Sequence, residues 1–224
     1  MKILVSGLSM SYLSGQPLYC YELCLELKRQ GHDVTMVSRW GGPLTGAEGY
    51  KLKENFIEYG IKIKEWNEPL DNDYDLIIAS ESVSEEILNK LPEIPAINVV
   101  HSEYDCETPI TDRPQIIKYV CIRHSIVRHI VDVHGIPENK CVVIYNGVDR
   151  KRFKKKKKVK RDYYKIVVPC TLDTMREPFL NKLIDGANEK RRIYFYGMYC
   201  GADLHQSPYV EIHPDKFNIE DEIA

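Results

Sequence analysis

The sequence predicts an α/β protein built on a doubly wound parallel sheet. Short apolar segments alternate with segments of helical periodicity along the 224 residues. An apolar run at 2–7, a helical segment ending at Gly31 and a second apolar run at 32–38 form the first strand–helix–strand unit. Such a unit starts a parallel sheet. The run at 75–79 is apolar throughout, as expected of a strand that is covered on both faces.

The same alternation continues along the rest of the chain. Further strands are expected at 61–63, 96–100, 119–122, 142–145, 165–169 and 192–196, and further helices at 50–59, 84–90, 125–134 and 179–188. Ser84 is expected to cap its helix. Ten basic residues between positions 150 and 161 interrupt the pattern. We therefore expect an N-terminal domain over residues 1–155 and a partial second domain over residues 156–224, each Rossmann-like, with a cleft between them.

Composition restricts the class of protein. With 43% hydrophobic residues the chain can bury a core, and no apolar run reaches the roughly 18 residues that cross a bilayer. The apolar stretch at the N-terminus is too short for the core of a signal peptide. Seven scattered cysteines without a Cys-x-x-Cys pair argue against a disulfide framework or a zinc site. These features predict a reduced, cytoplasmic protein without a metal ion, either free or peripheral to a membrane.

The basic run at 150–161 has three interpretations: a solvated linker, a patch for an anionic membrane surface, or a patch for nucleic acid. As a patch for a polyanion it would be formed by Lys154, Lys155, Lys156, Lys157 and Lys158. Because the run lies next to the predicted cleft, DNA carrying a modified base is one acceptor to consider. Such a base would first have to flip out of its duplex.

The loops that follow the predicted strands contain the candidate site, because ligands of open parallel sheets bind at the carboxyl ends of strands. The loop from Gly7 to Gly15 leads into a helix N-terminus, where backbone N–H groups favour a phosphate. His101 ends a predicted strand and is the candidate catalytic residue, since a neutral imidazole can accept a proton or bond to a hydroxyl group. The candidate residues of an acceptor cleft are Glu81, Glu103 and Asp105.

Several motifs resemble one family of enzymes. Residues 141–153, CVVIYNGVDRKRF, resemble the V-I-x-N-G-V-D-x-x-x-F signature at the domain crossover of GT-B glycosyltransferases of family four. Residues 1–38 are similar to the opening strand, glycine loop, helix and G-H-x-V strand of that family, with Ser14 and Gly15 at its glycine pair. DYDLIIASE resembles its fourth strand, and NVVHSEYD its T-x-H-D strand end. The motifs occur in the family's order over residues 1–153.

The resemblance implies a GT-B-like enzyme that moves a sugar from a UDP- or GDP-sugar donor to an acceptor, usually with retention and without a metal ion or other cofactor. It implies an acceptor-side N-terminal domain and a donor-side second domain. The residues expected at the donor phosphates are Ser14, Gly15, Gln16 and Arg176. His101 falls on the family's cleft histidine, which would help to position the transferred sugar. The acceptor stays open between a lipid-linked glycan, a small molecule and DNA.

The second domain departs from the family pattern. The stretch that matches its G-R…K-G motif is CTLDTMR, so Thr171 stands at the arginine position and Arg176 alone can replace the lysine. The E-x(7)-E motif is missing, and Arg123-His124 replaces a usual S-E pair. We therefore expect little activity from this chain alone. A non-catalytic module that binds an acceptor or a polyanion is the alternative, and an epimerase-like enzyme is a third interpretation, against which the absent G-x-G-x-x-G argues.

Overall fold

The computed structural model describes residues 1–10, 15–39, 47–80, 83–103, 110, 112–148, 150, 153, 160–214, 216, 219 and 222–223. The chain divides into two compact units, which we name unit 1 (Met1–Gly147) and unit 2 (Val148–Ala224). Both are α/β units with parallel sheets, so the predicted fold class is confirmed.

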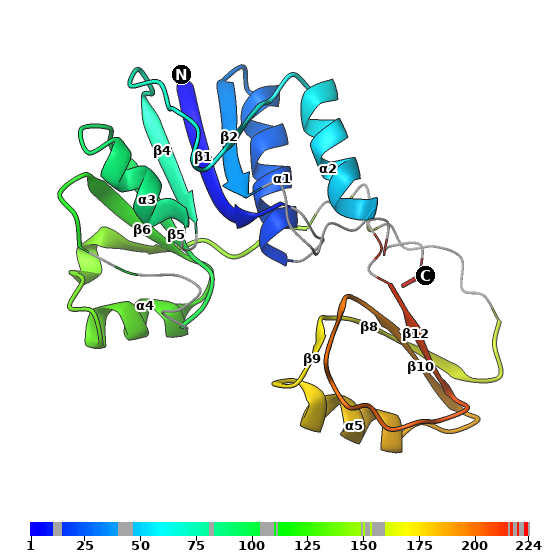
Figure 1. The fold of residues 1–224 in the computed structure, drawn as a ribbon. Coiled ribbons are helices and arrows are strands. Elements are labelled where there is room, and N and C mark those ends of the chain that lie inside the picture. The colour runs from blue at the N-terminus through cyan, green and yellow to red at the C-terminus, as the bar shows by residue number, and fades with distance from the viewer. Residues whose placement is uncertain are drawn as a thin grey trace. The chain divides into compact units, whose positions relative to one another are not determined.

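Unit 1 is built on a seven-stranded parallel sheet in the order β3-β2-β1-β4-β5-β6-β7 (Figure 1). Its strands are β1 (Lys2–Ser9), β2 (Asp33–Arg39), β3 (Lys62–Glu65), β4 (Leu76–Ser80), β5 (Ala96–Val100), β6 (Ile116–Cys121) and β7 (Cys141–Val143). Its helices are α1 (Gly15–Arg29), α2 (Ala47–Glu58), α3 (Val83–Lys90) and α4 (His124–Asp132), with a 3₁₀ turn, η1 (Glu138–Lys140). Figure 1 shows α1 and α2 on one face of the sheet and α3 and α4 on the other.

The strand order contains a topological switch point between β1 and β4. From β1 the chain moves outward to β2 and β3, and then returns to the other side of β1 to form β4 to β7. Because all seven strands are parallel, their carboxyl ends lie along one edge of the sheet. Ligands of open α/β sheets bind outside that edge, at the switch point. We refer to it below as the carboxyl edge of unit 1.

Helices pack on both faces of this sheet through buried hydrophobic side chains. On the α3 and α4 face, Leu4 and Ile77 pack with Ile87 of α3 and Ile126 of α4. On the α1 and α2 face, the buried Cys24 thiol contacts the Met36 sulfur at 4.0 Å, and Tyr21 packs edge-on against Phe56 with ring centroids 5.4 Å apart. Strands covered on both faces read as continuous apolar runs, which explains why the sequence pattern located them.

The start of α3 corrects one prediction. The helix begins at Val83, so Ser84 lies inside its first turn and is not the capping residue. The Ser84 hydroxyl is paired with the Ser6 hydroxyl of β1, with the two oxygen atoms 2.8 Å apart. The local sequence suggested a cap, but the hydroxyl serves a contact between helix and sheet.

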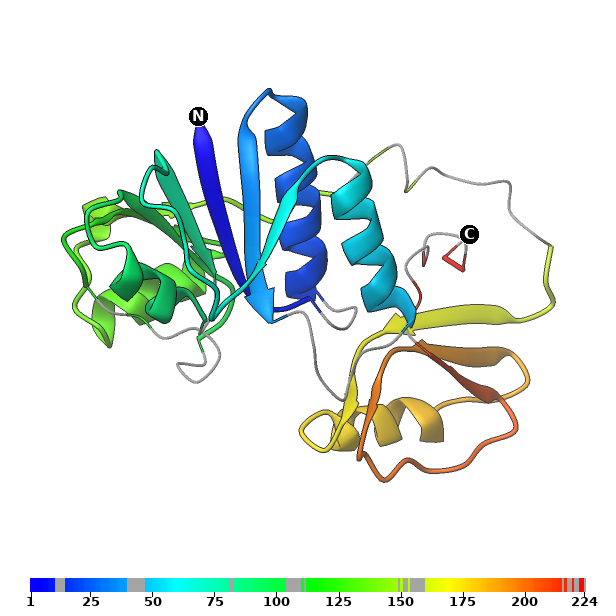
Figure 2. The same ribbon diagram turned by 45° about the horizontal axis from the view of Figure 1, so that its top comes forward.

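Unit 2 has a three-stranded parallel sheet in the order β12-β10-β8 and a short parallel pair, β11-β9. Its elements are β8 (Tyr164–Pro169), β9 (Leu172–Asp173), α5 (Glu177–Asp185), β10 (Arg191–Tyr196), β11 (Tyr199–Cys200) and β12 (Val210–His213). Figure 2 shows α5 along one face of the larger sheet, where Ile193 and Phe195 pack with Leu180 and Ile184. Unit 2 is thus a small α/β unit with parallel strands and one helix packed on its larger sheet. The strands β9, β11 and β12 were not predicted.

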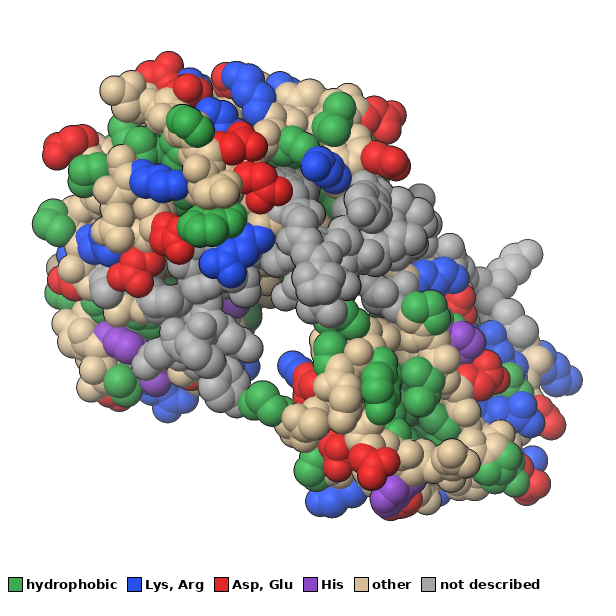
Figure 3. Space-filling view, viewed as in Figure 1, with side chains coloured by type: hydrophobic (Ala, Val, Ile, Leu, Met, Phe, Trp, Pro, Cys, Tyr) green, Lys and Arg blue, Asp and Glu red, His purple; other side chains and the backbone are tan. Residues whose placement is uncertain are grey.

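The surface of unit 1 carries both signs of charge. Figure 3 shows lysine and arginine side chains interspersed with aspartate and glutamate on the face in view. Exposed pairs such as Lys62 with Asp33, at 2.8 Å, contribute little to stability. Within the described residues, no helix combines the length and apolar character needed to cross a bilayer.

Gly197 provides a test of unit 2. A Cβ atom at this position would lie 1.8 Å from the carbonyl oxygen of Cys170, so β8 and β10 can approach each other only because Gly197 has no side chain. We expect Gly197→Ala to reduce the free energy of unfolding by about 3 kcal/mol and to reduce hydrogen-exchange protection in β8 and β10. A Cβ at Gly147 meets no described atom within 4 Å, so Gly147→Ala is the control. Equal stability of the two variants would contradict this packing.

Candidate functional site at the carboxyl edge of unit 1

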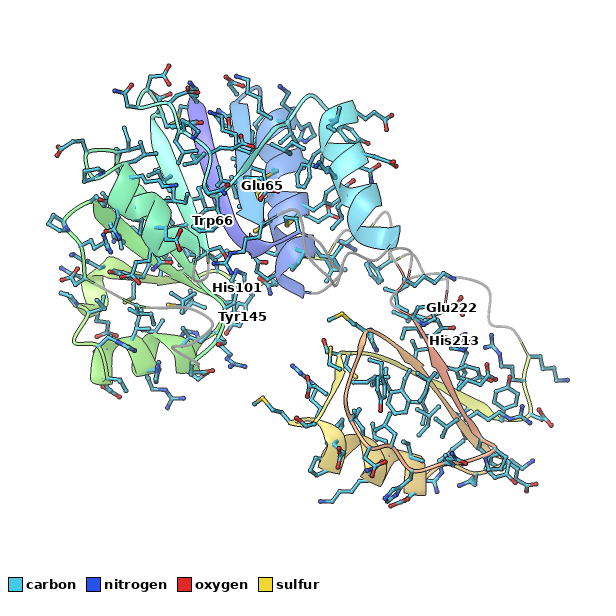
Figure 4. All side chains as sticks on the ribbon, viewed as in Figure 1. Glu65, Trp66, His101, Tyr145, His213 and Glu222 are labelled. Carbon is cyan, nitrogen blue, oxygen red and sulfur yellow. The ribbon has the colours of Figure 1, made fainter. Side chains whose placement is uncertain are left out.

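His101 lies at the carboxyl edge of unit 1, directly after β5 (Figure 4). Its ring meets the ring of Tyr19 from α1 edge to face, with centroids 4.7 Å apart and planes at 75°. The Nε2 atom of His101 is buried and has no hydrogen-bond partner among the described residues. The structure therefore confirms that His101 follows a strand directly, and it adds a buried polar atom whose hydrogen-bonding capacity no described residue satisfies.

Burial keeps both rings uncharged at neutral pH. Loss of solvent lowers the pKa of His101 to about 4, because burial disfavours the charged imidazolium. Burial likewise raises the pKa of Tyr19 to about 12, chiefly because the phenolate would lose its hydration. A neutral imidazole has one nitrogen that donates a hydrogen bond and one that accepts. His101 is thus suited to hold a hydroxyl group and is a weak base at pH 7.

The first turn of α1 covers the end of β1. A Cβ atom on Gly7 would lie 2.5 Å from the Gln16 side-chain nitrogen, so the Gln16 amide lies directly above Gly7. That amide also donates a hydrogen bond to the Cys20 sulfur at 3.1 Å. A Cβ atom at Gly15, the first residue of α1, would meet no described atom within 4 Å. The backbone at this helix start is therefore accessible, as a phosphate-binding helix N-terminus requires.

Two serines that the sequence analysis did not select lie at the same edge. Ser38 is the penultimate residue of β2 and Ser80 is the last residue of β4; both are buried. Neither hydroxyl has a hydrogen-bond partner among the described residues. A buried polar atom without a partner is uncommon and calls for an explanation, such as a ligand. A serine at the end of an apolar run, as in VTMVS and LIIAS, was the available sequence signal.

Glu103 is held by the start of α4. Its carboxylate accepts a hydrogen bond from the Ser125 hydroxyl at 2.7 Å and pairs with the Arg123 guanidinium. The Ser125 hydrogen bond, followed by the pair with Arg123, lowers the pKa of Glu103. Both carboxylate oxygens already have partners, so Glu103 fixes the chain after β5 against α4. Arg123 is one of the departures from the family pattern. In the structure its guanidinium pairs with Glu103.

Arg176 lies in unit 2, immediately before α5. Its backbone N–H donates to a carboxylate oxygen of Asp173 at 2.9 Å, and its guanidinium pairs with the same carboxylate. The positive charge at this helix start is therefore already balanced by Asp173. A donor phosphate would have to share Arg176 with that carboxylate.

The other predicted site residues lie outside the described residues. They are Ser14, Glu81, Asp105 and the lysines from Lys154 to Lys158. The part of the chain that the structure describes contains no group of three or more His, Cys, Asp or Glu side chains arranged to hold a metal ion.

The sequence of residues 13–152 matches the family model of Glycosyltransferase Family 4. The chain belongs to Glycosyltransferase Family 4. The match extends over nearly all of unit 1, including α1, both buried serines and His101. No curated protein matches the sequence at a significant level.

Solved glycosyltransferase structures share the fold of this Glycosyltransferase Family 4 chain. One is Anabaena Alr3699/HepE, solved in complex with UDP-glucose, with a TM-score of 0.71 at 13% identity. The match covers 100% of this chain and 71% of that one. Another is a glycosyltransferase from Rickettsia africae ESF-5, with a TM-score of 0.67 at 16% identity, covering 99% of this chain and 70% of the other. These likenesses confirm the GT-B fold.

The buried imidazole predicts a pH dependence of stability. The pKa of His101 is about 4 in the folded protein and about 6.5 in an unfolded chain, so the unfolded chain binds the proton first as the pH falls. The contribution of His101 to stability is complete above pH 6.5 and is lost between pH 6.5 and 4. Relative to His101→Gln, the wild type should lose about 1–2 kcal/mol of unfolding free energy between pH 7 and 5. Chemical denaturation at both pH values measures this, and an identical pH dependence of the two proteins would contradict the burial of His101.

Proposed function

We propose that this chain transfers a sugar from a nucleotide-sugar donor to a hydroxyl group of an acceptor held at the carboxyl edge of unit 1. Membership of Glycosyltransferase Family 4 supports the reaction class. The observation that carries the proposal is the unpartnered Nε2 atom of His101, beside the accessible N-terminus of α1 at the switch point of the sheet. UDP-glucose is the first donor to test, since Alr3699/HepE was solved with it.

In the proposed reaction one bond forms and one breaks. The acceptor hydroxyl oxygen bonds to the anomeric carbon, and the bond from that carbon to the diphosphate oxygen breaks. The diphosphate leaves with the electron pair, and the hydroxyl proton passes to the departing phosphate. Catalysis then depends on positioning and on stabilising the charge of the leaving group. Retention at the anomeric carbon and independence of metal ions are further parts of the proposal, which product NMR and added chelator would test.

His101 has a positioning part in this scheme. With a pKa of about 4, its imidazole is neutral at pH 7 and is a poor general base. It can still form a hydrogen bond to a sugar hydroxyl through Nε2. The contact with Tyr19 fixes the ring orientation, so the imidazole is prepared for this bond before the sugar binds.

The role of His101 is tested by His101→Ala, which removes one hydrogen bond to the sugar. We expect kcat/KM for UDP-glucose to fall about 5- to 30-fold, the effect of losing about one to two kcal/mol of transition-state binding. His32→Ala is the control, because His32 lies at the opposite edge of the sheet, 3.5 Å from the Met1 amino nitrogen. Equal effects of the two substitutions would refute the proposed role.

The donor phosphates are proposed to approach the backbone at Gly15. Because a methyl group there meets no described atom within 4 Å, Gly15→Ala should leave the melting temperature unchanged or slightly raised. The same methyl group would obstruct a phosphate, so KM for UDP-glucose should rise about tenfold or more. Gly147→Ala is the matched control, with open space around its Cβ position. An unchanged KM in Gly15→Ala would show that the phosphates bind elsewhere.

The alternative function, a non-catalytic acceptor-binding module, has a distinct outcome. A panel of UDP-, GDP- and ADP-sugars separates the two functions. Calorimetry measures whether each donor binds, and release of the free nucleotide measures whether it is turned over. Turnover of any donor that depends on His101 supports the proposed enzyme. Acceptor binding without binding of any donor would leave the binding module as the function of this chain.

A further inference from the structure

The larger sheet of unit 2 has an amino edge, where its parallel strands begin. β8 and β10 are neighbours in this sheet, with Arg191 paired with Tyr164 (Figure 1). The Tyr164 N–H group donates a hydrogen bond to the Lys190 carbonyl oxygen at 2.8 Å. The segments that lead into these strands, 160–163 and 188–190, therefore lie side by side. Ligands of parallel sheets bind at the carboxyl edge, so the amino edge is available for another role.

Cations without counter-ions gather at this amino edge. Five exposed basic residues lie in the two segments and at the start of β10, and we name them the basic surface of unit 2: Lys160, Arg161, Lys190, Arg191 and Arg192. None of the five forms an ion pair with a described residue, whereas Lys165 of the same unit pairs with Glu222 at 3.0 Å. The acidic residues among them are Asp162 and Glu189, so an excess of positive charge remains.

The two units carry opposite net charges. Unit 2 contains 17 Lys and Arg against 12 Asp and Glu, and unit 1 contains 14 against 21. With neutral histidines the net charges are +5 for unit 2 and −7 for unit 1, in agreement with −2 for the chain. An anionic partner is therefore attracted to unit 2 and repelled by unit 1.

The tyrosines beside the basic surface do not form a platform for nucleic-acid bases. The Arg192 guanidinium lies over the Tyr163 ring at 4.4 Å, and the Lys165 ammonium lies over the Tyr194 ring at 5.2 Å. Of the tyrosines in these strands and their lead-in segments, Tyr164 has the most exposed side chain, at 75%. Proteins bind single strands through successive free rings, and they read duplexes with an element that enters a groove.

An anionic membrane surface has simpler requirements. Exposed lysine and arginine side chains are attracted to anionic headgroups without a fixed geometry. A tyrosine side chain favours the level of the headgroups, because its ring is apolar and its hydroxyl group is polar. Tyr164 precedes Lys165 at the start of β8 and lies next to Lys190 and Arg191, so it offers such a ring within the basic surface.

We propose that the basic surface of unit 2 binds the anionic headgroups of a membrane, with Tyr164 at the level of the headgroups. The inference does not rest on the proposed function, because it concerns residues of unit 2 alone. Lys160 and Arg161 are also the last residues of the basic run at 150–161. Lys190 and Arg191 join them only through the pairing of β8 with β10, so the surface depends on the fold as well as on the run.

Co-sedimentation of the whole chain with vesicles tests the surface. The probes are vesicles of phosphatidylcholine alone and vesicles that contain about one third phosphatidylglycerol. We expect binding to the anionic vesicles to exceed binding to the neutral ones about tenfold or more, and to weaken as salt is added, because salt screens exposed charges. Equal binding to both kinds of vesicle, or no binding to either, would overturn the inference.

A double substitution locates the binding. Lys190→Gln/Arg191→Gln removes two exposed charges that lie outside the basic run, so the melting temperature should be unchanged while binding to anionic vesicles falls about tenfold. Lys118→Gln/Arg128→Gln is the matched control, because it removes two exposed charges from unit 1. Equal effects of the two double substitutions would refute the basic surface of unit 2.

Nucleic acid is the competing partner and needs its own measurement. Single-stranded and duplex DNA are added at the same phosphate concentration as the anionic vesicles. Tighter binding of either DNA than of the vesicles, lost in Lys190→Gln/Arg191→Gln, would overturn the membrane assignment. UDP-glucose turnover in solution should be the same in this variant and in the wild type. Failure of vesicle binding would therefore leave the proposed transferase function intact.

Discussion

The packing of α1 against β1 at Gly7 is the contact on which the carboxyl edge of unit 1 depends. A Cβ atom there would lie 2.5 Å from the Gln16 amide and 3.1 Å from both the Cys20 sulfur and the terminal carbon of Met36. Without that side chain, the N-terminus of α1 can sit at the switch point between β1 and β4. An accessible helix start, two buried hydroxyls and an imidazole thus lie along the same edge of the sheet, although they come from four separate parts of the chain.

Burial determines the chemistry of this place. The same packing that covers His101 with Tyr19 removes the imidazole from solvent and keeps it neutral. The packing also leaves the Ser38 and Ser80 hydroxyls without partners among the described residues. Leaving such groups unpaired costs about 1–3 kcal/mol each, which a bound hydroxyl group would recover. The unpaired groups thus lower the free energy of unfolding of the free protein, and they lie at the edge where the sugar is proposed to bind.

Sequence patterns predicted the elements that are buried on both faces. The apolar run at 75–79 corresponds to β4 at Leu76–Ser80, and the run at 96–100 coincides with β5. The short, half-exposed strand β12 was missed, because its four residues have no continuous apolar run. Ser84 was wrongly predicted to be a cap, because its partner Ser6 is 78 positions away.

The candidate site was predicted only in part. His101 was found because it follows an apolar run and resembles a family motif. Ser38 and Ser80 were not found, because their relation depends on β2, β1 and β4 lying side by side, and this order cannot be read from the chain. The ion-pair partners of Glu103 and Arg176 could not be predicted from the sequence either. Asp173 neutralises Arg176, whereas composition alone presented that arginine as a free cation.

The central claim is that the carboxyl edge of unit 1, on its α1 face, is where the sugar binds. Backbone and histidine-ring chemical shifts, recorded while a neutral sugar and then UDP-glucose are added, test it most directly. The account predicts that the largest shifts fall at Gly7, Gln16, Ser38, Ser80 and His101. Shifts confined to other surfaces, with the His101 ring signals unmoved, would contradict it.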